Sequence, residues 1–166
     1  MKKLRDRSEL TAYIVYPCLD LGTGEAYPFG GRLPDGVIGI DKEPKVPNTV
    51  KHDLLNGIPF KDKSFETVTA FEIFEHIPPD KREFLVEEIK RVCRKRVIIS
   101  VPDKNDRRSF PLDNPSHEHN LHPDWLFDLR EAIELAEKFS KNYEIFEIEN
   151  EFHYGYGLVI YLEEKS

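Results

Sequence analysis

The sequence predicts an α/β domain whose doubly wound, mostly parallel seven-stranded sheet ends in an antiparallel strand. Short apolar, β-branched runs alternate with longer polar segments, which is the pattern of parallel strands joined by helices. The length of 166 residues is typical of one domain, so we assign 1–166 to a single domain. Only 149–157 separates the last two predicted strands, and so short a connection favours an antiparallel hairpin over a helical crossover.

Seven segments have the composition of strands. Each is a short run that is rich in β-branched or aromatic residues and is bounded by turn-forming residues. The first of them leads directly into a glycine turn. In chain order the predicted strands are 13–21, 37–41, 49–54, 67–71, 97–101, 143–148 and 158–162.

The first predicted helix begins at Asp80 and ends at the basic run 94–96. Asp80 is suited to cap the helix, with Glu83 three residues further on as its partner in a capping box. Basic residues suit a helix C-terminus, so we interpret the run as helix electrostatics rather than as a nucleic-acid patch. One helical face carries Leu85, Ile89 and Val92.

A second helix is predicted over 123–140, with Trp125 packed at its start. The other two connections are too rich in breakers to be helices. The segment 25–36 contains two prolines and a glycine pair, which leaves room for one turn, and 42–48 contains two prolines. We therefore expect helices to be reduced on one face of the sheet. The apolar face of the second helix carries Leu126, Leu129, Ile133 and Ala136.

Composition and charge exclude several classes of protein. Aromatic residues make up 11% of the chain, which argues against disorder. The formal net charge of −7 disfavours strong non-specific binding to nucleic acid. The chain has no glutamine and one methionine, a usage typical of thermophile proteins.

The location that we expect is the cytoplasm. Cys18 and Cys93 are far apart and form neither a zinc pattern nor a disulfide framework, which fits a reducing compartment. The longest stretch without a charged side chain, 152–162, is shorter than the roughly 20 residues that a membrane span needs. Charged residues close to the basic start do not fit a signal peptide. We therefore expect neither a membrane anchor nor an exported protein.

A glycine turn follows the first predicted strand. Gly22 and Gly24 would let the backbone approach a ligand closely. Asp41 ends the second strand about 20 residues after Asp20, where an acidic residue is placed to bind ribose hydroxyls. Ala26 replaces the third glycine of a dinucleotide fingerprint, and no helix N-terminus follows to hold a pyrophosphate. The pattern favours a nucleoside without phosphates over NAD. On these residues alone, a plain turn with a solvated strand end is an equal alternative.

Three further pieces occur in a characteristic order and spacing: "IPFKDKSFETV", "FEIFEHI" and "RVCRKRVIISVP". Over roughly 18–129 the chain resembles the class I S-adenosylmethionine-dependent methyltransferases. The resemblance implies a Rossmann-like fold, S-adenosylmethionine as cofactor, and methyl transfer as activity. A silent domain that binds the cofactor and serves as a partner or regulator is the main alternative. A nicotinamide-dependent reductase is a weaker one, because Tyr161-x-x-x-Lys165 lies on the terminal strand.

The resemblance also implies a set of cofactor contacts. Asp41 would hold the ribose hydroxyls, Asp53 would accept from the adenine amino group, and Phe71 and Glu72 would face the sulfonium. The chain departs from the family pattern at Ala26, in its proline-broken first helix, and in lacking a Pro-Gly-Gly turn before the fifth strand. The implied cofactor-binding residues are Asp20, Gly22, Thr23, Gly24, Asp41, Lys42, Asp53, Leu54, Phe71 and Glu72.

Two clusters carry groups suited to activate an acceptor, for which we favour a hydroxyl. The first is the E-x-x-E-H run from Glu72 to His76, and the second is the loop that holds His117 and His119. Branches of the family that share both features bind a divalent ion through them, which implies a Mg, Mn or Zn site here. Without a metal, His76, His117 and His119 are the candidates for acid–base or acceptor-orienting roles, and a polar lid or a brace for the helix start is the alternative. The implied metal ligands are Glu72, Glu75, His76 and His119.

The acceptor is a small molecule or an RNA that the sequence does not identify. We expect its recognition to come from 1–16, the loop 107–122 and the final hairpin. Lys104, Arg107 and Arg108 make this loop basic; we interpret them as exposed loop residues, with phosphate or carboxylate binding as the alternative. No role is predicted for His52 or His153 beyond structure or solvation, and neither cysteine is placed to act as a nucleophile.

Overall fold

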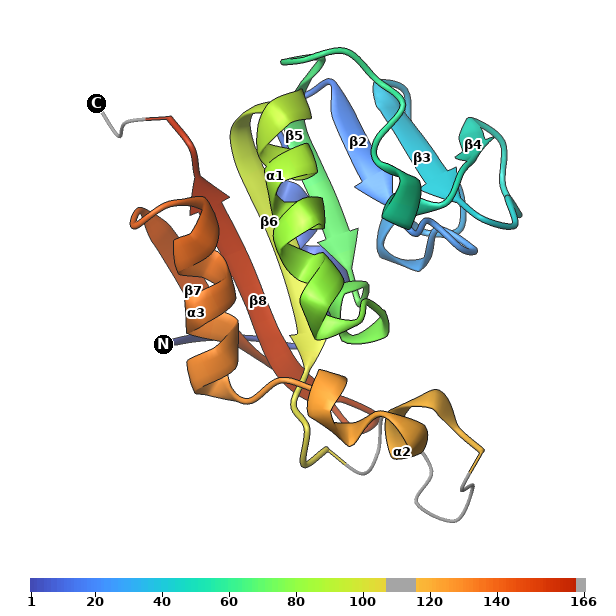
Figure 1. Cartoon of the computed structure of the whole chain (residues 1–166). Coiled ribbons are helices and arrows are strands. Elements are labelled where there is room, and N and C mark those ends of the chain that lie inside the picture. The colour runs from blue at the N-terminus through green and yellow to red at the C-terminus, as the bar shows by residue number, and fades with distance from the viewer. Residues whose placement is uncertain (107–115, 164–166) are drawn as a thin grey trace.

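The computed structural model of the protein describes residues 1–106 and 116–163. Within them, eight strands form one sheet in the order β1-β7-β8-β6-β5-β2-β3-β4 (Figure 1). Only β8 is reversed, since it is antiparallel to both β6 and β7 while all other pairs are parallel. The predicted α/β class and the reversed last strand are confirmed. The strands are β1 Lys2–Leu4, β2 Cys18–Leu21, β3 Val37–Asp41, β4 Thr49–Lys51, β5 Phe65–Phe71, β6 Cys93–Pro102, β7 Tyr143–Glu149 and β8 Tyr154–Tyr161.

The predicted count of seven strands was one too low, and the first predicted strand was too long. The missed strand β1 has three residues and pairs in parallel with β7 at the edge of the sheet. Of the predicted strand 13–21, only Cys18–Leu21 is extended in the sheet, and Arg7–Tyr13 forms a 3₁₀ helix instead. Pro17 lacks the N–H that a central strand donates, so it stands just before β2.

Helices α1 (Arg82–Val92) and α3 (Leu129–Phe139) cover the same face of the sheet (Figure 1). The predicted cap was wrong, because Asp80 lies inside a 3₁₀ turn and the N-cap position belongs to Lys81. The basic run 94–96 was also misplaced, since α1 ends at Val92 and β6 begins at the next residue. These basic side chains therefore belong to a strand. They pair with Glu66 and Glu163 instead of completing a helix.

The predicted second helix, 123–140, is divided. A 3₁₀ turn, Pro123–Trp125, comes first, and Trp125 stacks on His122 with 3.9 Å between ring centroids. The chain then extends to Asp128, which caps α3 by accepting a hydrogen bond from the Glu131 N–H at 2.8 Å. The N-cap of α3 is therefore Asp128, five residues after the predicted start of the helix at Pro123.

The opposite face of the sheet is thinly covered, as predicted. Two 3₁₀ helices, Arg7–Tyr13 and the single turn Tyr27–Phe29, pack there, and no helix joins β3 to β4. Leu10 is fully buried against this face beside Phe146 and Val159. None of the helices in the two described ranges has both the length and the apolar character needed to cross a bilayer.

Candidate functional site

Three cavities meet at the carboxyl ends of β2, β3 and β5, which is the ligand edge of a doubly wound sheet. We call them the nucleoside cavity, of about 390 Å³, the glycine-loop cavity, of about 380 Å³, and the acidic cavity, of about 390 Å³. The nucleoside cavity is lined by Gly22, Asp41, Lys42, His52, Asp53, Leu54, Glu72, Ile73 and His76, among others. The glycine-loop cavity is lined by Arg7, Asp20, Gly22, Thr23, Gly24, Tyr27, Lys45 and Phe71, among others. The acidic cavity is lined by Asp6, Arg7, Tyr27, Glu72, Glu75, His76, His119, Phe152 and His153, among others.

The glycine turn has the backbone that its sequence predicts. Gly22 has φ +66° and Gly24 has φ +53°, a region that favours glycine. A Cβ on Gly22 would lie 2.0 Å from Ile73 Cδ1, whereas one on Gly24 would meet nothing within 4 Å. The Gly24 N–H donates to Asp41 Oδ2 at 2.7 Å. Asp41 thus ties the glycine loop to the end of β3 and leaves open space beside Gly24 for a ligand.

The predicted nucleoside contacts lie together. Asp53 Oδ1 accepts from the Leu55 N–H at 2.9 Å, and Asp53 Oδ2 is 3.8 Å from Lys42 Nζ. Leu54 follows on the same 3₁₀ turn. Lys42, Asp53, Leu54 and Leu55 all line the nucleoside cavity. His52 also lines it, and the buried Nε2 of His52 has no hydrogen-bond partner within the residues described. His52 was predicted to be a structural or solvated residue, although its place just before Asp53 was a signal of a site residue.

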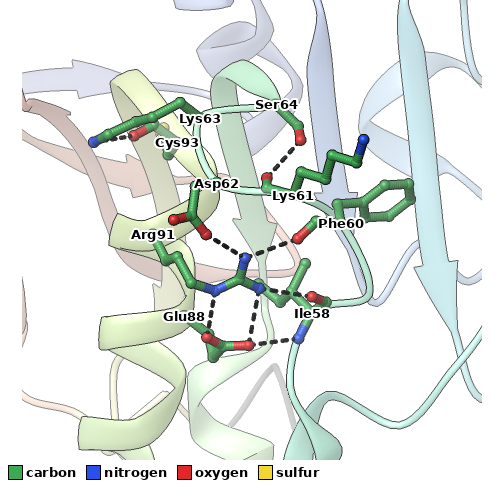
Figure 2. Close-up of polar contacts among 9 residues, drawn as sticks. All are labelled: Ile58, Phe60, Lys61, Asp62, Lys63, Ser64, Glu88, Arg91 and Cys93. Atoms are coloured by element: carbon green, nitrogen blue, oxygen red, sulfur yellow. Dashed lines mark hydrogen bonds and ion pairs between the residues drawn. The ribbon is translucent and has the colours of Figure 1, made fainter.

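The segment that carries these contacts is tied to α1 by one arginine (Figure 2). The Arg91 guanidinium donates to the carbonyls of Ile58 and Phe60, each at 2.8 Å, and to Asp62 at 3.0 Å. Glu88 holds Arg91 from the other side at 2.7 and 3.1 Å, and also accepts from the Ile58 N–H. The chain that follows the nucleoside cavity is therefore fixed to a helix in the core.

Asp20 and Phe71 lie deeper, against the glycine-loop cavity. Asp20 is 3% exposed and accepts from Thr69 Oγ1 at 2.6 Å. Burial raises the pKa of Asp20 to about 7, an effect that the hydrogen bonds from Thr69 and Thr23 oppose. Phe71 is buried and packs edge-on against Phe29. Both residues thus lie where the methionine part of the cofactor was expected.

Glu72 lines both the nucleoside cavity and the acidic cavity. Its backbone has φ +57°, which is unusual for a side chain of this size. Its carboxylate accepts from Ser100 Oγ at 3.3 Å and lies 3.3 Å from His153 Nε2. Burial raises the pKa of Glu72 to about 7. The interpretation of His153 as a structural or solvated residue was incomplete, because its side chain reaches into the acidic cavity from the β7–β8 turn.

Three of the four predicted metal ligands come together. Glu75, His76 and His119 each offer a ligand atom within 4.8 Å of the others. Glu75 is 2% exposed, and burial, together with the neighbouring Glu72 charge, raises the pKa of Glu75 well above its usual range. Glu75 Oε1 is buried without a hydrogen-bond partner within the described ranges. Glu72 is turned toward His153 and lies outside this triad.

The histidines of the second cluster take different positions. His119 lines the acidic cavity, and its ring stacks on His76 at 5.2 Å. Burial, together with the charges of His76 and His117, lowers the pKa of His119 to about 4. His117 accepts from the His119 N–H at 3.2 Å as the N-cap of α2 (Glu118–Leu121) and does not line any of the three cavities. Glu118, which the sequence analysis did not single out, hydrogen-bonds to His76 Nδ1.

The remaining predictions concern the loop after β6 and the cysteines. Lys104 is paired with Asp128 at 3.0 Å and Glu131 at 2.9 Å, so its charge is engaged by α3. Cys18 and Cys93 are buried, and burial raises the pKa of both thiols, that of Cys93 to about 11. A buried thiol with a raised pKa is seldom ionised, and the thiolate is the nucleophilic form. Arg107, Arg108 and Lys165 lie outside the described residues.

The chain matches one protein family and is similar to several solved structures. The family model of the methyltransferase domain matches residues 19–101. A SAM dependent methyltransferase from Aquifex aeolicus is 18% identical, with 96% of this chain and 91% of that chain covered and a TM-score of 0.68. One from Archaeoglobus fulgidus is 17% identical, with 93% and 92% covered and a TM-score of 0.63. Magnesium protoporphyrin IX methyltransferase from Synechocystis PCC 6803, with bound SAM, is 13% identical, with 95% and 78% covered and a TM-score of 0.63. No curated protein matches the chain.

Proposed function

This chain belongs to the methyltransferase domain family, and we propose that it transfers the methyl group of S-adenosylmethionine to a hydroxyl of its acceptor. The chain is a S-adenosylmethionine-dependent methyltransferase with a Rossmann-like fold. We place the nucleoside of the cofactor in the nucleoside cavity and its methionine part in the glycine-loop cavity. The glycine turn, the positions of Asp41 and Asp53 on the wall of the nucleoside cavity, and the open space beside Gly24 support this placement.

The acceptor is proposed to enter through the acidic cavity. This cavity shares Glu72 and His76 with the nucleoside cavity and Arg7 and Tyr27 with the glycine-loop cavity. The methyl group would be transferred where the three cavities meet, because only there can acceptor and cofactor touch. Holding the two reactants in line supplies about 7–11 kcal/mol of the barrier in favourable cases.

The observation that carries the hydroxyl preference is the triad of Glu75, His76 and His119. An alcohol is a weak nucleophile until its proton is lost, so its methylation needs a base or a cation beside it. The buried Oε1 of Glu75, which no described residue hydrogen-bonds, together with the imidazoles of His76 and His119, fits a divalent cation. His119 stays neutral at pH 7, and neutral imidazole is the form that binds a metal.

A bound Mg, Mn or Zn ion would lower the pKa of the acceptor hydroxyl by acting as a Lewis acid. Glu75, His76 and His119 would hold this ion, with Glu118 orienting His76 through Nδ1. Glu72, fixed by Ser100 and His153, would face the acceptor from the cofactor side. Its hydrophobic neighbours Ile73 and Phe71 would keep water from the transferring methyl group.

The test is a transfer assay with tritiated S-adenosylmethionine over small hydroxyl compounds, amines and RNA. We expect label in a hydroxyl acceptor, loss of transfer in excess EDTA, and recovery with one of Mg, Mn or Zn. Glu75→Gln and His119→Ala should lose the metal response, and Glu87→Gln, on the exposed face of α1, should keep it. Full activity in EDTA would overturn the metal site and leave His76 or His119, which line the acidic cavity, as the candidate base. Cofactor binding without transfer to any acceptor would favour the silent domain.

A further inference from the structure

Two exposed aromatic side chains line the same cavity. Phe152 is 74% exposed and Tyr27 is 57% exposed, the two highest values among the phenylalanine, tyrosine and tryptophan side chains that the structure describes. Both line the acidic cavity, although Phe152 comes from the β7–β8 turn and Tyr27 from the 3₁₀ turn after β2. Single exposed apolar side chains are ordinary on a protein surface, but exposed rings that gather at one cavity mark a ligand site.

The turn that carries Phe152 is fixed by hydrogen bonds. Asn150 Oδ1 accepts from the Phe152 N–H at 2.8 Å, and the Asn150 N–H donates to the His153 carbonyl at 2.9 Å. Asn150 Nδ2 also donates to the Arg5 carbonyl at 2.7 Å, which ties the turn to the segment after β1. The backbone of Phe152 is therefore positioned before an acceptor arrives, and binding loses little conformational entropy there.

Tyr27 is held in place as well. Its hydroxyl donates to Asp6 Oδ2 at 3.1 Å, and the Arg7 guanidinium carbon lies 4.6 Å from the centre of its ring. Tyr27 lines the glycine-loop cavity too, whereas Phe152 lines the acidic cavity and neither of the other two. Phe152 is therefore the ring that can recognise an acceptor without contacting the cofactor.

The charge and size of the acidic cavity favour a small molecule over a nucleic acid. An RNA phosphate in this cavity would lie beside the carboxylates of Asp6 and Glu72, which are outside the proposed metal triad. The net charge of −7 adds to this repulsion. The volume of about 390 Å³ is within the range of small-molecule sites.

We propose that the acceptor is a small aromatic compound with its hydroxyl on a flat ring, and that Phe152 selects it by packing against that ring. The inference rests on the proposed function, because it takes the acidic cavity as the acceptor's site. Aromatic rings attract each other in offset-stacked and edge-to-face contacts, and a saturated ring gains no such attraction. An aromatic hydroxyl also ionises near pH 10, as tyrosine does, so it needs less activation than an aliphatic alcohol.

Calorimetric titration of the complex with S-adenosylhomocysteine, using two matched probes, tests the assignment. 2-Naphthol is flat and aromatic, and decahydro-2-naphthol has the same carbon skeleton and hydroxyl without an aromatic ring. The saturated probe is the more hydrophobic of the two, so a merely apolar surface would bind it at least as tightly. We expect the wild type to bind 2-naphthol about 10-fold more tightly than decahydro-2-naphthol.

Phe152→Leu removes the ring and keeps an apolar side chain at an exposed position. We expect its Kd for 2-naphthol to rise about 10-fold, while its Kd for decahydro-2-naphthol and for S-adenosylhomocysteine changes less than about 2-fold. Phe152→Tyr keeps the ring and should bind 2-naphthol within about 2-fold of the wild type. The matched control is Phe84→Leu, because Phe84 is 45% exposed on α1 and lines none of the three cavities, and it should leave all three Kd values unchanged.

Three results would overturn the aromatic acceptor. They are equal binding of the two probes by the wild type, equal losses for both probes in Phe152→Leu, and absence of 2-naphthol binding by a protein that binds S-adenosylhomocysteine. A short oligouridylate that displaces 2-naphthol from the wild type would assign the ring to a nucleic-acid base instead of a small acceptor. Failure of the wild type to bind S-adenosylhomocysteine is a different result, because it would overturn the proposed function itself.

Discussion

Glu72 Oε1 lies 3.3 Å from His153 Nε2, which joins the end of β5 to the turn between β7 and β8. The Glu72 N–H donates to the Ser100 carbonyl at 2.9 Å, and the Glu72 carboxylate also accepts from the Ser100 hydroxyl. The end of β5, strand β6 and the β7–β8 turn thus hold one carboxylate at the junction of two cavities, although its backbone has φ +57°. A strained residue that its surroundings hold so firmly is characteristic of functional sites.

Glu72→Gly should separate stability from activity. Glycine adopts positive φ without strain, so we expect the free energy of unfolding to rise by about 1 kcal/mol while methyl transfer falls at least 100-fold. Asn48→Gly is the matched control, because Asn48 has φ +64° in an exposed turn, and it should leave activity unchanged. Thermal melts and transfer rates provide the two measurements. A Glu72→Gly protein with full activity would show that the strain serves the fold alone.

Asp41→Ala should weaken binding of S-adenosylhomocysteine by 10-fold or more. The variant loses a proposed ribose contact and also the acceptor that holds the Gly24 N–H at 2.7 Å. In the wild type, ligand at 100 times its Kd should add about 2.7 kcal/mol to the free energy of unfolding. Thermal shift and calorimetry measure both effects. The control is Asp35→Ala, on the exposed loop before β3, and equal affinity in the two variants would remove Asp41 from the ribose site.

Asp20→Asn should change how stability depends on pH. Burial raises the folded-state pKa of Asp20 to about 7, above its ordinary value of about 3.9, so the folded chain binds more protons between those values. The wild type therefore loses stability as pH rises from about 4 to 7. Asparagine cannot ionise, so we expect the variant to be more stable by about 4 kcal/mol at pH 8 and to show no gain at pH 4. Urea titrations at both pH values check this, and a gain that does not vary with pH would contradict it.

Arg91→Met should destabilise the fold and free the segment 58–62, which follows the nucleoside cavity, from α1. The change leaves the carbonyls of Ile58 and Phe60 and the Glu88 carboxylate without their shared donor (Figure 2). We expect a loss of about 2–3 kcal/mol in urea unfolding, as for hydrogen bonds to a charged group. Arg94→Met is the control, because Arg94 is exposed and pairs with Glu66 at 3.6 Å, and it should cost less than about 0.5 kcal/mol. Similar losses in the two variants would mean that Arg91 is an ordinary surface cation.

Much of the cofactor site could be predicted because it depends on local sequence. Gly22 and Gly24 need positive φ wherever the chain turns so tightly, Asp41 is the last residue of β3, and Asp53 comes two residues after β4. Parallel strands end at one edge of the sheet, so residues at those ends come together without further information. The errors in the helices were also local. Asp80 and Pro123 each had the signature of a helix start, but 3₁₀ turns form at both positions and the α-helices begin later.

Short-range patterns of apolar residues, prolines and glycines were enough to predict the alternation of strands and helices, the reversed last strand and the glycine turn. The three-dimensional packing of the chain was needed to show that Glu72 turns to His153 and leaves Glu75, His76 and His119 as a triad. It also decided that Arg7 reaches the glycine loop and that β1 pairs with β7. These contacts join distant segments, and side-chain direction there depends on packing, which no local pattern encodes.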